Sequence, residues 1–510
     1  MRLLCVAATL AVAGVARGQD TLAGRLEAVM DGPDYAAARW GVLVADATTG
    51  DVVYARNADK LCTPASTTKL YTCAAALVAL GADHTFVTQV VRRGEVGSTG
   101  TLKGDLILIA SGDPTFGGRT TADGKLAFKD HDHTYANSGL MASELTATDP
   151  LAGLDDLARQ VKAAGVTQVT GEVLIDARLF APAAGTGSGP DSISPICVND
   201  NVLDLTIAPG AKAGDPATVT VRPATACVQV DIDVTTGGLT VVRLDSPAKG
   251  RFVVRGSIPV GAKPIVRILP VDDPAAFARG LFIEALRRAG VRVAAPLHAA
   301  GPATLPEKPA ELTQVASYTS PPLGELVKVV LKVSHNLYAG ALPCVVAAKR
   351  GHTTLADGLR EEGKILKGLG VDPKGISLGS GAGGSWADCV SPRATVTLLQ
   401  AMRKRDDWPL YKAALPGLGL DGTTVDVVSP DSPAKGKAFG KTGTLVYTNA
   451  LTGANLLRSK ALAGVLTTAG GRELVYCFMV NDVPLPPGVP TSREGKVLGK
   501  LAEIVVTHGP

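Results

Sequence analysis

A long strand-rich segment, from about residue 84 to residue 310, interrupts a chain that otherwise mixes helices with strands. Short apolar and β-branched runs recur through it, with turn residues between them. These runs predict strands at Phe86–Arg92, Leu102–Ala110, Val169–Asp176, Ala217–Val221, Val228–Val234, Thr240–Leu244, Arg251–Val254 and Lys263–Leu269. Helices are predicted at Pro150–Ala164 and Pro274–Ala289. With 510 residues, this pattern favours several compact units over one continuous core.

The two flanking segments alternate between helix and strand. Before the strand-rich segment we expect one helix, two strands (Trp40–Asp46 and Val52–Arg56) and a helix that opens at Ser66. After it, helices are predicted at Leu323–Lys332, Asn336–Lys349, Leu355–Leu369, Pro392–Arg403 and Ser492–Thr507. Late strands are predicted at Lys441–Thr448, Lys460–Thr467 and Leu474–Asn481, and the last two form a hairpin around Ala469-Gly470-Gly471.

The N-terminus has the pattern of an export signal. Arg2 precedes an apolar run over Leu3–Val15, and Ala16-Arg17-Gly18 supplies small residues before a cleavage point. The run is too short to span a membrane. We therefore expect residues 1–18 to be removed and the mature protein to be exported, without a transmembrane anchor, to the periplasm or another extracytoplasmic compartment that faces the cell wall.

Composition excludes several other classes of protein. A formal net charge of +4, from 51 basic and 47 acidic residues, lacks the concentrated basic field of a nucleic-acid binder. Eight cysteines without a C-x-x-C pair argue against a zinc ribbon or a thioredoxin-type site. Seven of them remain after the signal, and Cys197 and Cys227 either form a bridge or stay reduced.

The first chemical motif is Ser66-Thr67-Thr68-Lys69. A serine and a lysine three residues apart on a helix share one face, so the amine can lie beside the hydroxyl. Such a lysine accepts the proton of the serine only when burial or a neighbouring cation lowers its pKa. The same spacing occurs at Ser246–Lys249 and Ser432–Lys435, but a glycine follows each of these, and only Ser66 opens a helix.

Two further motifs lie near the C-terminus. Ser334-His335-Asn336 falls in a break between two predicted helices, from which the hydroxyl can relay a proton and the amide can hold a substrate amide and Lys69. Lys441-Thr442-Gly443-Thr444 begins a strand, and Gly443 allows a substrate backbone to approach closely. Its lysine and hydroxyls suit a carboxylate, and the backbone N–H groups of Ser66 and Thr444 suit an oxyanion.

The three motifs occur in the order typical of penicillin-binding proteins and serine β-lactamases. The chain resembles that superfamily over nearly the whole mature sequence, and more narrowly the D-alanyl-D-alanine carboxypeptidase/endopeptidase group of the penicillin-binding protein 4 type. Further segments similar to this group are Leu106–Phe116 (which contains Gly112-Asp113-Pro114-Thr115), Ser320–Leu323, Gly379-Ser380-Gly381, Leu415-Pro416 and Asp421-Gly422-Thr423.

The resemblance implies an α/β (α+β) fold, with an antiparallel sheet flanked by helices and a catalytic domain that is split in the sequence. Its parts are expected at residues 19–84 and 311–510. Residues 85–310 are expected to form inserted β-rich subdomains, two in number, the inner one at about 181–270. Ser66 and Ser334 would then lie on either side of the insertion and come together on folding.

The resemblance also implies the chemistry. Ser66 attacks the carbonyl of a D-Ala-D-X bond in a peptidoglycan peptide with Lys69 as base, and Ser334 and Lys441 assist proton transfer to the leaving amine. The set of catalytic residues is Ser66, Lys69, Ser334, Asn336 and Lys441, with Thr442, Gly443 and Thr444 binding the substrate. β-Lactam antibiotics are expected as covalent inhibitors, and no metal or organic cofactor is needed. The alternatives are a β-lactamase or esterase with the same site, or an inactive peptidoglycan-binding protein.

Two polar features depart from the family or stand outside its motifs. His335 occupies a position where the superfamily often has Asp or Asn, and its side chain either faces solvent or gives the activity a modest pH dependence. Asp130-His131-Asp132-His133 contains potential metal ligands, but its alternating spacing suits a solvated loop better than a tetrahedral site.

Overall fold

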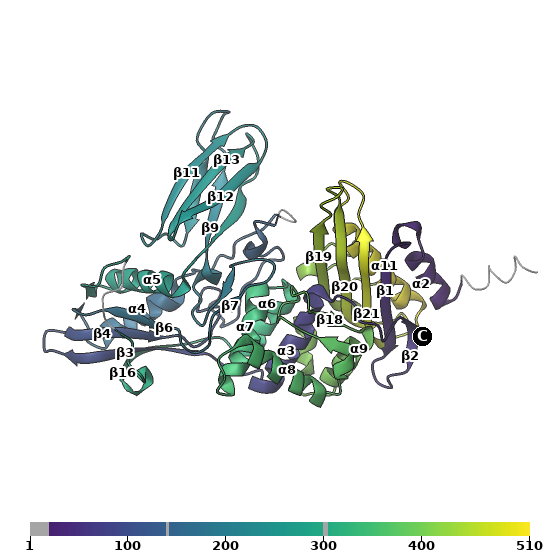
Figure 1. Cartoon of the computed structure of the whole chain (residues 1–510), viewed down its shortest axis with the longest axis horizontal. Helices are drawn as coiled ribbons and strands as arrows, with labels where there is room; N and C mark the ends of the chain where they lie inside the picture. The colour runs from purple at the N-terminus through teal and green to yellow at the C-terminus, as the bar shows by residue number, and fades with distance from the viewer. Residues whose placement is uncertain (1–19, 139–141, 299–303) are drawn as a thin grey trace, which may run out of the picture. The chain divides into compact units, whose positions relative to one another are not determined.

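The computed structural model describes residues 20–138, 142–298 and 304–510 (Figure 1). The predicted signal peptide, residues 1–18, lies outside the described residues. The chain forms two compact units: within the described residues, the first comprises 20–79, 330–334 and 359–510, and the second comprises Leu80–Val329 and His335–Gly358. Each unit is therefore assembled from separate pieces of the sequence.

The first unit is organised around a five-stranded antiparallel sheet. Its order is β19 (Ala438–Thr448), β20 (Asn455–Thr467), β21 (Glu473–Pro484), β1 (Arg39–Asp46) and β2 (Val52–Arg56). The hairpin predicted around Ala469–Gly471 joins β20 to β21, as expected. The antiparallel sheet and its flanking helices confirm the predicted fold class, and β19, which carries the Lys441 motif, lies at an edge of the sheet.

Helices cover both faces of this sheet, because its central strands are apolar on both sides. Trp40, Val42 and Val44 of β1 pack in one core with α2 (Leu22–Met30) and α11 (Ser492–His508). On the other face, a Cβ atom added to Gly41 would lie 3.1 Å from the Pro392 ring, at the start of α9 (Pro392–Arg403). Alternating side chains of one strand thus meet different helices.

The remaining helices lie close to the predicted bounds. The turn η2 (Ala65–Thr67) leads into α3 (Thr68–Leu80), and α6 (Leu323–Lys332) is followed by α7 (Asn336–Lys349) and α8 (Leu355–Gly368). The short helix α10 (Trp408–Ala414) and the short strands β17 (Ile376–Ser377) and β18 (Cys389–Val390) were not predicted. Among the described residues, no helix is both long and apolar enough to cross a membrane.

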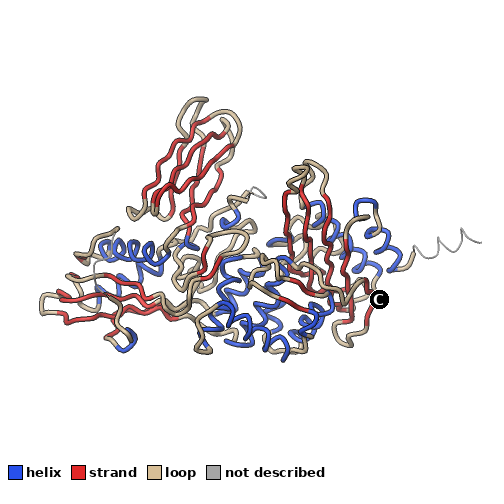
Figure 2. Tube along the Cα trace, viewed as in Figure 1, coloured by secondary structure: helices blue, strands red, loops and turns tan. Residues whose placement is uncertain are grey.

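The second unit is rich in strands (Figure 2). One sheet has the order β15-β5-β4-β3-β16, with β6 also paired to β4, and two three-stranded sheets have the orders β10-β9-β14 and β11-β13-β12. The strand bounds are β3 Val87–Val96, β4 Thr101–Ile109, β5 Gln168–Val169, β6 Val173–Asp176, β7 Ala183–Ala184, β8 Ser192–Ile193, β9 Val202–Ala208, β10 Thr218–Arg222, β11 Gln229–Thr236, β12 Val241–Ala248, β13 Arg251–Ile258, β14 Ile265–Pro270, β15 Arg292–Val293 and β16 Thr313–Thr319.

One apolar core joins these sheets to α4 (Ala152–Ala163) and α5 (Pro274–Arg288). The strand predicted at Val169–Asp176 is two strands, β5 and β6, and β9 was not predicted. None of the seven cysteines that the structure describes forms a disulfide, so the Cys197–Cys227 bridge considered from the sequence is not formed. Cys197 is buried and behaves as a small apolar side chain.

Candidate active site

Ser66 is the middle residue of η2, just before α3, in a deeply buried stretch of chain. From residue 62 to residue 77 every side chain is buried except that of Ser66. The preceding residue, Ala65, has a positive φ of 47°, a conformation that is uncommon for a residue other than glycine. The fold therefore leaves Ser66 as the one partly exposed residue of an otherwise buried segment.

Lys69 lies beside this hydroxyl. Its Nζ is 2.9 Å from Ser66 Oγ and donates a hydrogen bond to the carbonyl oxygen of Ala382, at 2.7 Å. The Lys69 side chain is fully buried, and this burial lowers its pKa from 10.5 to about 7. A substantial fraction of Lys69 is thus neutral near pH 7 and able to accept a proton, as the sequence motif requires.

The loop of residues 379–388, called here the 379–388 loop, holds the carbonyl that binds Lys69. The Asp388 carboxylate accepts hydrogen bonds from the backbone N–H groups of Gly379 and Ser385 and from the Ser380 hydroxyl, each at 2.8 Å. Thr72, one turn after Lys69, donates to the Gly381 carbonyl at 2.9 Å. Sequence reasoning singled out neither Thr72 nor Asp388, although both fix the surroundings of the amine.

Gly383 in this loop is required for steric and conformational reasons. A Cβ atom added to Gly383 would lie 1.9 Å from the Ala65 carbonyl oxygen, and the φ of Gly383 is +93°. Only glycine combines this backbone conformation with so close an approach. The glycine-rich run 381–384 thus lets the 379–388 loop touch the residue before Ser66.

We expect Gly383→Ala to lower the free energy of unfolding by roughly 3 kcal/mol or more, since positive-φ strain and overpacking add. Gly370→Ala is the matched control, because its φ is +86° but a Cβ atom there would meet nothing within 4 Å. It is expected to cost about 1 kcal/mol. Urea unfolding of both variants measures the difference, and equal losses would contradict the close approach.

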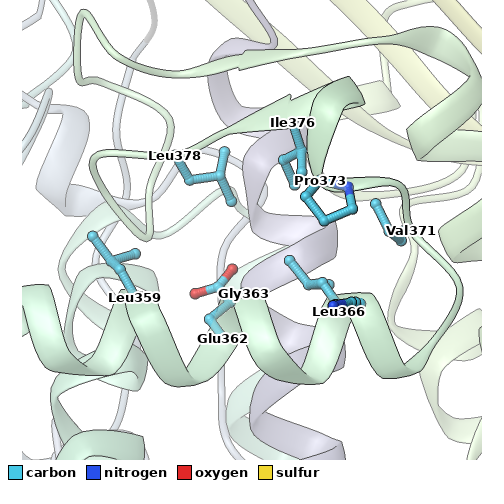
Figure 3. Close-up of a pocket in the computed structure, with 9 residues that line it drawn as sticks. Leu359, Glu362, Gly363, Leu366, Val371, Pro373, Ile376 and Leu378 are labelled. Carbon is cyan, nitrogen blue, oxygen red and sulfur yellow. The ribbon is translucent and has the colours of Figure 1, made fainter.

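Glu362 on α8 carries a buried carboxyl group that contacts Thr72. Glu362 Oε1 is 3.3 Å from Thr72 Oγ1, and burial raises the pKa of Glu362 to about 8. The side chain points from α8 toward the segment 371–378, into a cavity of about 170 Å³ (Figure 3). The other lining residues are mostly apolar: Leu359, Gly363, Leu366, Lys367, Val371, Pro373, Ile376 and Leu378. None of the predicted site residues lines this cavity.

Ser334 lies in the break between α6 and α7. It has a positive φ of 63° and is only 6% exposed. Two residues earlier, Lys332 Nζ lies 2.6 Å from Asp421 Oδ2 and donates to the Leu415 carbonyl at 2.9 Å. These contacts hold the end of α6 and so fix where the Ser334 turn begins.

The next two residues belong to the second unit. Asn336 opens α7, and its Nδ2 donates to Ser188 Oγ at 3.0 Å. His335 is fully buried, so the expectation that its side chain faces solvent is wrong. Its Nδ1 accepts the Tyr338 backbone N–H at 3.3 Å, and its ring stacks on that of Tyr338 at 3.6 Å. Burial lowers the pKa of His335, and its Nε2 faces the Asp200 carboxylate at 3.3 Å.

Lys441 and Gly443 lie on the face of β19 that packs against the start of η2. Lys441 is fully buried and its Nζ donates to the Thr442 carbonyl at 2.8 Å. Burial, and then the charge of Lys69, hold the pKa of Lys441 well below its usual range. A Cβ atom added to Gly443 would lie 2.5 Å from the Pro64 carbonyl oxygen. The structure thus brings the first and third motifs together through Gly443.

Thr442 and Thr444 alternate onto the opposite face of β19. Thr442 Oγ1 donates to Thr423 Oγ1 at 2.7 Å, and Thr444 Oγ1 accepts a hydrogen bond from Lys460 at 2.9 Å. Both threonines are partly exposed. Because β19 is an edge strand, both partly exposed threonines lie at the border of the sheet.

The segment Asp130–His133, which the sequence predicted to be a solvated loop, is partly buried in the structure. Asp132 and His133 are buried, so a wholly solvated loop is wrong. His133 lies 2.5 Å from Asp204 and 2.7 Å from Asp200; burial alone would lower its pKa, but Asp204 and Asp132 raise it to about 10. One ligand atom each of Asp132, His133 and Asp200 lie within 4.8 Å of one another.

Arg119 forms ion pairs with two members of the cluster of Asp132, His133 and Asp200. Its guanidinium pairs with Asp132 at 2.8 Å and with Asp200 at 2.7 Å. A protonated imidazole cannot ligate a metal, and the carboxylates already face two cations. The donor set fits a buried ion-pair network and does not fit a metal centre.

The fold and the contact between Ser66 and Lys69 are those expected of a serine-type hydrolase. The chain belongs to the D-Ala-D-Ala carboxypeptidase 3 (S13) family, whose model matches residues 22–496. It is a serine-type D-alanyl-D-alanine carboxypeptidase of the penicillin-binding type, and the resemblance inferred from the motifs is confirmed.

Relatives and solved structures agree with this membership. The chain is 30% identical over 451 residues to a D-alanyl-D-alanine carboxypeptidase of Actinomadura sp. (strain R39), covering 84% of this chain and 77% of the relative. It is 24% identical to D-alanyl-D-alanine carboxypeptidase DacB of Haemophilus influenzae, covering 86% and 85%. The crystal structure of penicillin binding protein 4 (dacB) from Haemophilus influenzae matches with a TM-score of 0.70 and 20% identity, over 93% of this chain and 98% of that one.

Proposed function

We propose that the protein is exported and hydrolyses D-Ala-D-X bonds of peptidoglycan peptides through an acyl-enzyme on Ser66. The observation that carries the proposal is the 2.9 Å approach of Lys69 Nζ to Ser66 Oγ, with burial lowering the pKa of Lys69 to about 7. A neutral amine at this distance is positioned to take the hydroxyl proton as the oxygen attacks. Residues 1–18 serve as the export signal, and residues 85–310 form the insertion.

In acylation, Ser66 Oγ bonds to the substrate carbonyl carbon while its proton passes to Lys69. The backbone N–H groups of Ser66 and Thr444 stabilise the oxyanion that forms. The carbon–nitrogen bond then breaks, and the proton passes through Ser334 and Lys441 to the leaving amine. Asn336 holds the substrate amide, and Thr442 and Thr444 hold the terminal carboxylate.

In deacylation, water attacks the ester carbonyl. Its proton returns to Ser66 Oγ, and the shortened peptide leaves as a carboxylic acid. A β-lactam reacts at the same serine by ring opening, and because its ring nitrogen stays attached, the acyl-enzyme persists. The solved Haemophilus influenzae penicillin binding protein 4 in complex with a β-lactam, which matches this chain with a TM-score of 0.69 at 21% identity, supports this inhibitor class.

The proposal is tested by fluorescent penicillin labelling followed by product analysis on muropeptides. We expect long-lived labelling of the protein and release of D-Ala from pentapeptide monomers. Conversion of cross-linked dimers to monomers would add endopeptidase action on the same site. Rapid loss of the label with turnover of penicillin would favour a β-lactamase, and neither labelling nor product would favour a peptidoglycan-binding protein without activity.

A further inference from the structure

Lys460 is a buried cation that the proposed reaction does not use. It lies on β20 directly opposite Thr444 of β19 in the strand register. Its side chain is only 8% exposed, and its Nζ donates a hydrogen bond to Thr444 Oγ1 at 2.9 Å. A hydroxyl proposed to bind the substrate is therefore in contact with an ammonium group from the neighbouring strand.

Among the described residues, no carboxylate oxygen lies within 4.0 Å of this ammonium group. The acidic side chain whose charge acts on it is that of Glu494 on α11. Glu494 is engaged elsewhere: it accepts from the Tyr35 hydroxyl at 2.5 Å and from Arg493 Nε at 2.6 Å. A buried cation without a paired anion is unfavourable, so this location favours binding of an anion.

The helix that covers Lys460 leaves space for its side chain. A Cβ atom added to Gly495 of α11 would lie 3.3 Å from Lys460 Cε and 3.6 Å from its Nζ. Burial lowers the pKa of Lys460 to about 8, against the opposing charge of Glu494. The amine is therefore mostly protonated at pH 7 and supplies a positive charge beneath the edge strand.

We infer that Lys460 is a positioning residue for the terminal carboxylate of the substrate and that it acts through the Thr444 hydroxyl. Because the ammonium group donates to Thr444 Oγ1, that hydroxyl keeps its own proton to donate outward to a carboxylate. The ammonium charge polarises this hydroxyl and strengthens the outward bond. The inference rests on the proposed function and deepens it: it assigns to Lys460 the discrimination between a terminal carboxylate and a terminal amide.

The test uses Lys460→Met, which keeps the side-chain length and removes the charge. The measurements are kcat and KM for a D-Ala-D-Ala-terminated peptide and for the same peptide with a C-terminal amide. We expect kcat/KM for the acid to fall 10- to 100-fold, mainly through KM, which is the range for one charge-assisted hydrogen bond. The amide is expected to change less than twofold, and the unfolding midpoint is not expected to fall.

Lys500→Met is the control, since Lys500 is an exposed lysine of α11 that pairs with Glu503; it should leave both substrates unaffected. On a Thr444→Val background, Lys460→Met should change KM less than twofold, because its partner is already absent. Equal losses for acid and amide, or a fall in kcat alone, would overturn the inference while the proposed function stands. A wild type that releases no D-Ala would overturn both.

Discussion

Ser66→Ala is expected to abolish covalent labelling by penicillin and to lower kcat/KM for D-Ala release by about 10⁴-fold or more. The acyl-enzyme cannot form without the hydroxyl, and loss of a nucleophile removes most of the rate enhancement at a site of this kind. Ser66 is partly exposed while its neighbours are buried, so the substitution should leave the fold intact. Labelling by fluorescent penicillin and D-Ala release from a pentapeptide measure the two losses.

The matched control for this experiment is Ser246→Ala. Ser246 and Lys249 have the same spacing as Ser66 and Lys69, but Ser246 is an exposed residue of β12. Lys249 lies in the turn after β12, and its ammonium group pairs with Asp273 at 2.6 Å, so it is not held beside the Ser246 hydroxyl. Ser246→Ala should keep full labelling and activity. Labelling that survived Ser66→Ala would assign the nucleophile to another residue.

Local patterns predicted much of the fold around the site. The helices α6, α7 and α9 begin and end at the predicted residues, and side-chain caps precede α7 and α9, at His335 and Ser391. The predicted helix start at Ser66 is shifted by only two residues, since η2 precedes α3. The strand β9 (Val202–Ala208), which lies between β10 and β14, was missed, although Leu203, Leu205 and Ile207 alternate with Asp204 and Thr206 in a local strand pattern.

The groups that surround the predicted residues depend on contacts between distant parts of the chain. His133 meets Asp200, 67 residues away, so its segment looks like a polar loop in the sequence. Lys69 is held by Ala382, 313 residues away. Glu362 did leave a local signal, because it falls between Leu359 and Leu366 at helical spacing, on the apolar side of α8. An acidic residue at such a position indicates a buried carboxyl group.

Lys69 is expected to set the pH dependence of acylation. Its pKa is lowered by burial to about 7, so the amine is neutral above this pH and protonated below it. The rate of acylation by penicillin should therefore fall about tenfold per pH unit below pH 7 and level off above it. A rate that stayed constant between pH 5 and 8 would exclude Lys69 as the base.

Replacing Lys69 with methionine should separate this chemical role from stability. We expect acylation to fall by about 10²- to 10⁴-fold, the range for loss of a general base.

The folded state keeps the Lys69 pKa below its value of 10.5 in an exposed lysine. The unfolded chain therefore binds more protons between pH 7 and 10.5, and the stability of the wild type rises with pH in that range. Replacing the amine removes the free-energy cost of burying it in the folded state, although the Ala382 carbonyl loses its hydrogen-bond donor. Lys69→Met should therefore gain about 1–2 kcal/mol in the free energy of unfolding at pH 7, and urea unfolding at pH 7 and pH 10 should show that the gain shrinks at the higher pH. A difference in stability between the two proteins that did not change from pH 7 to pH 10 would contradict the lowered pKa of Lys69 that the proposed mechanism requires.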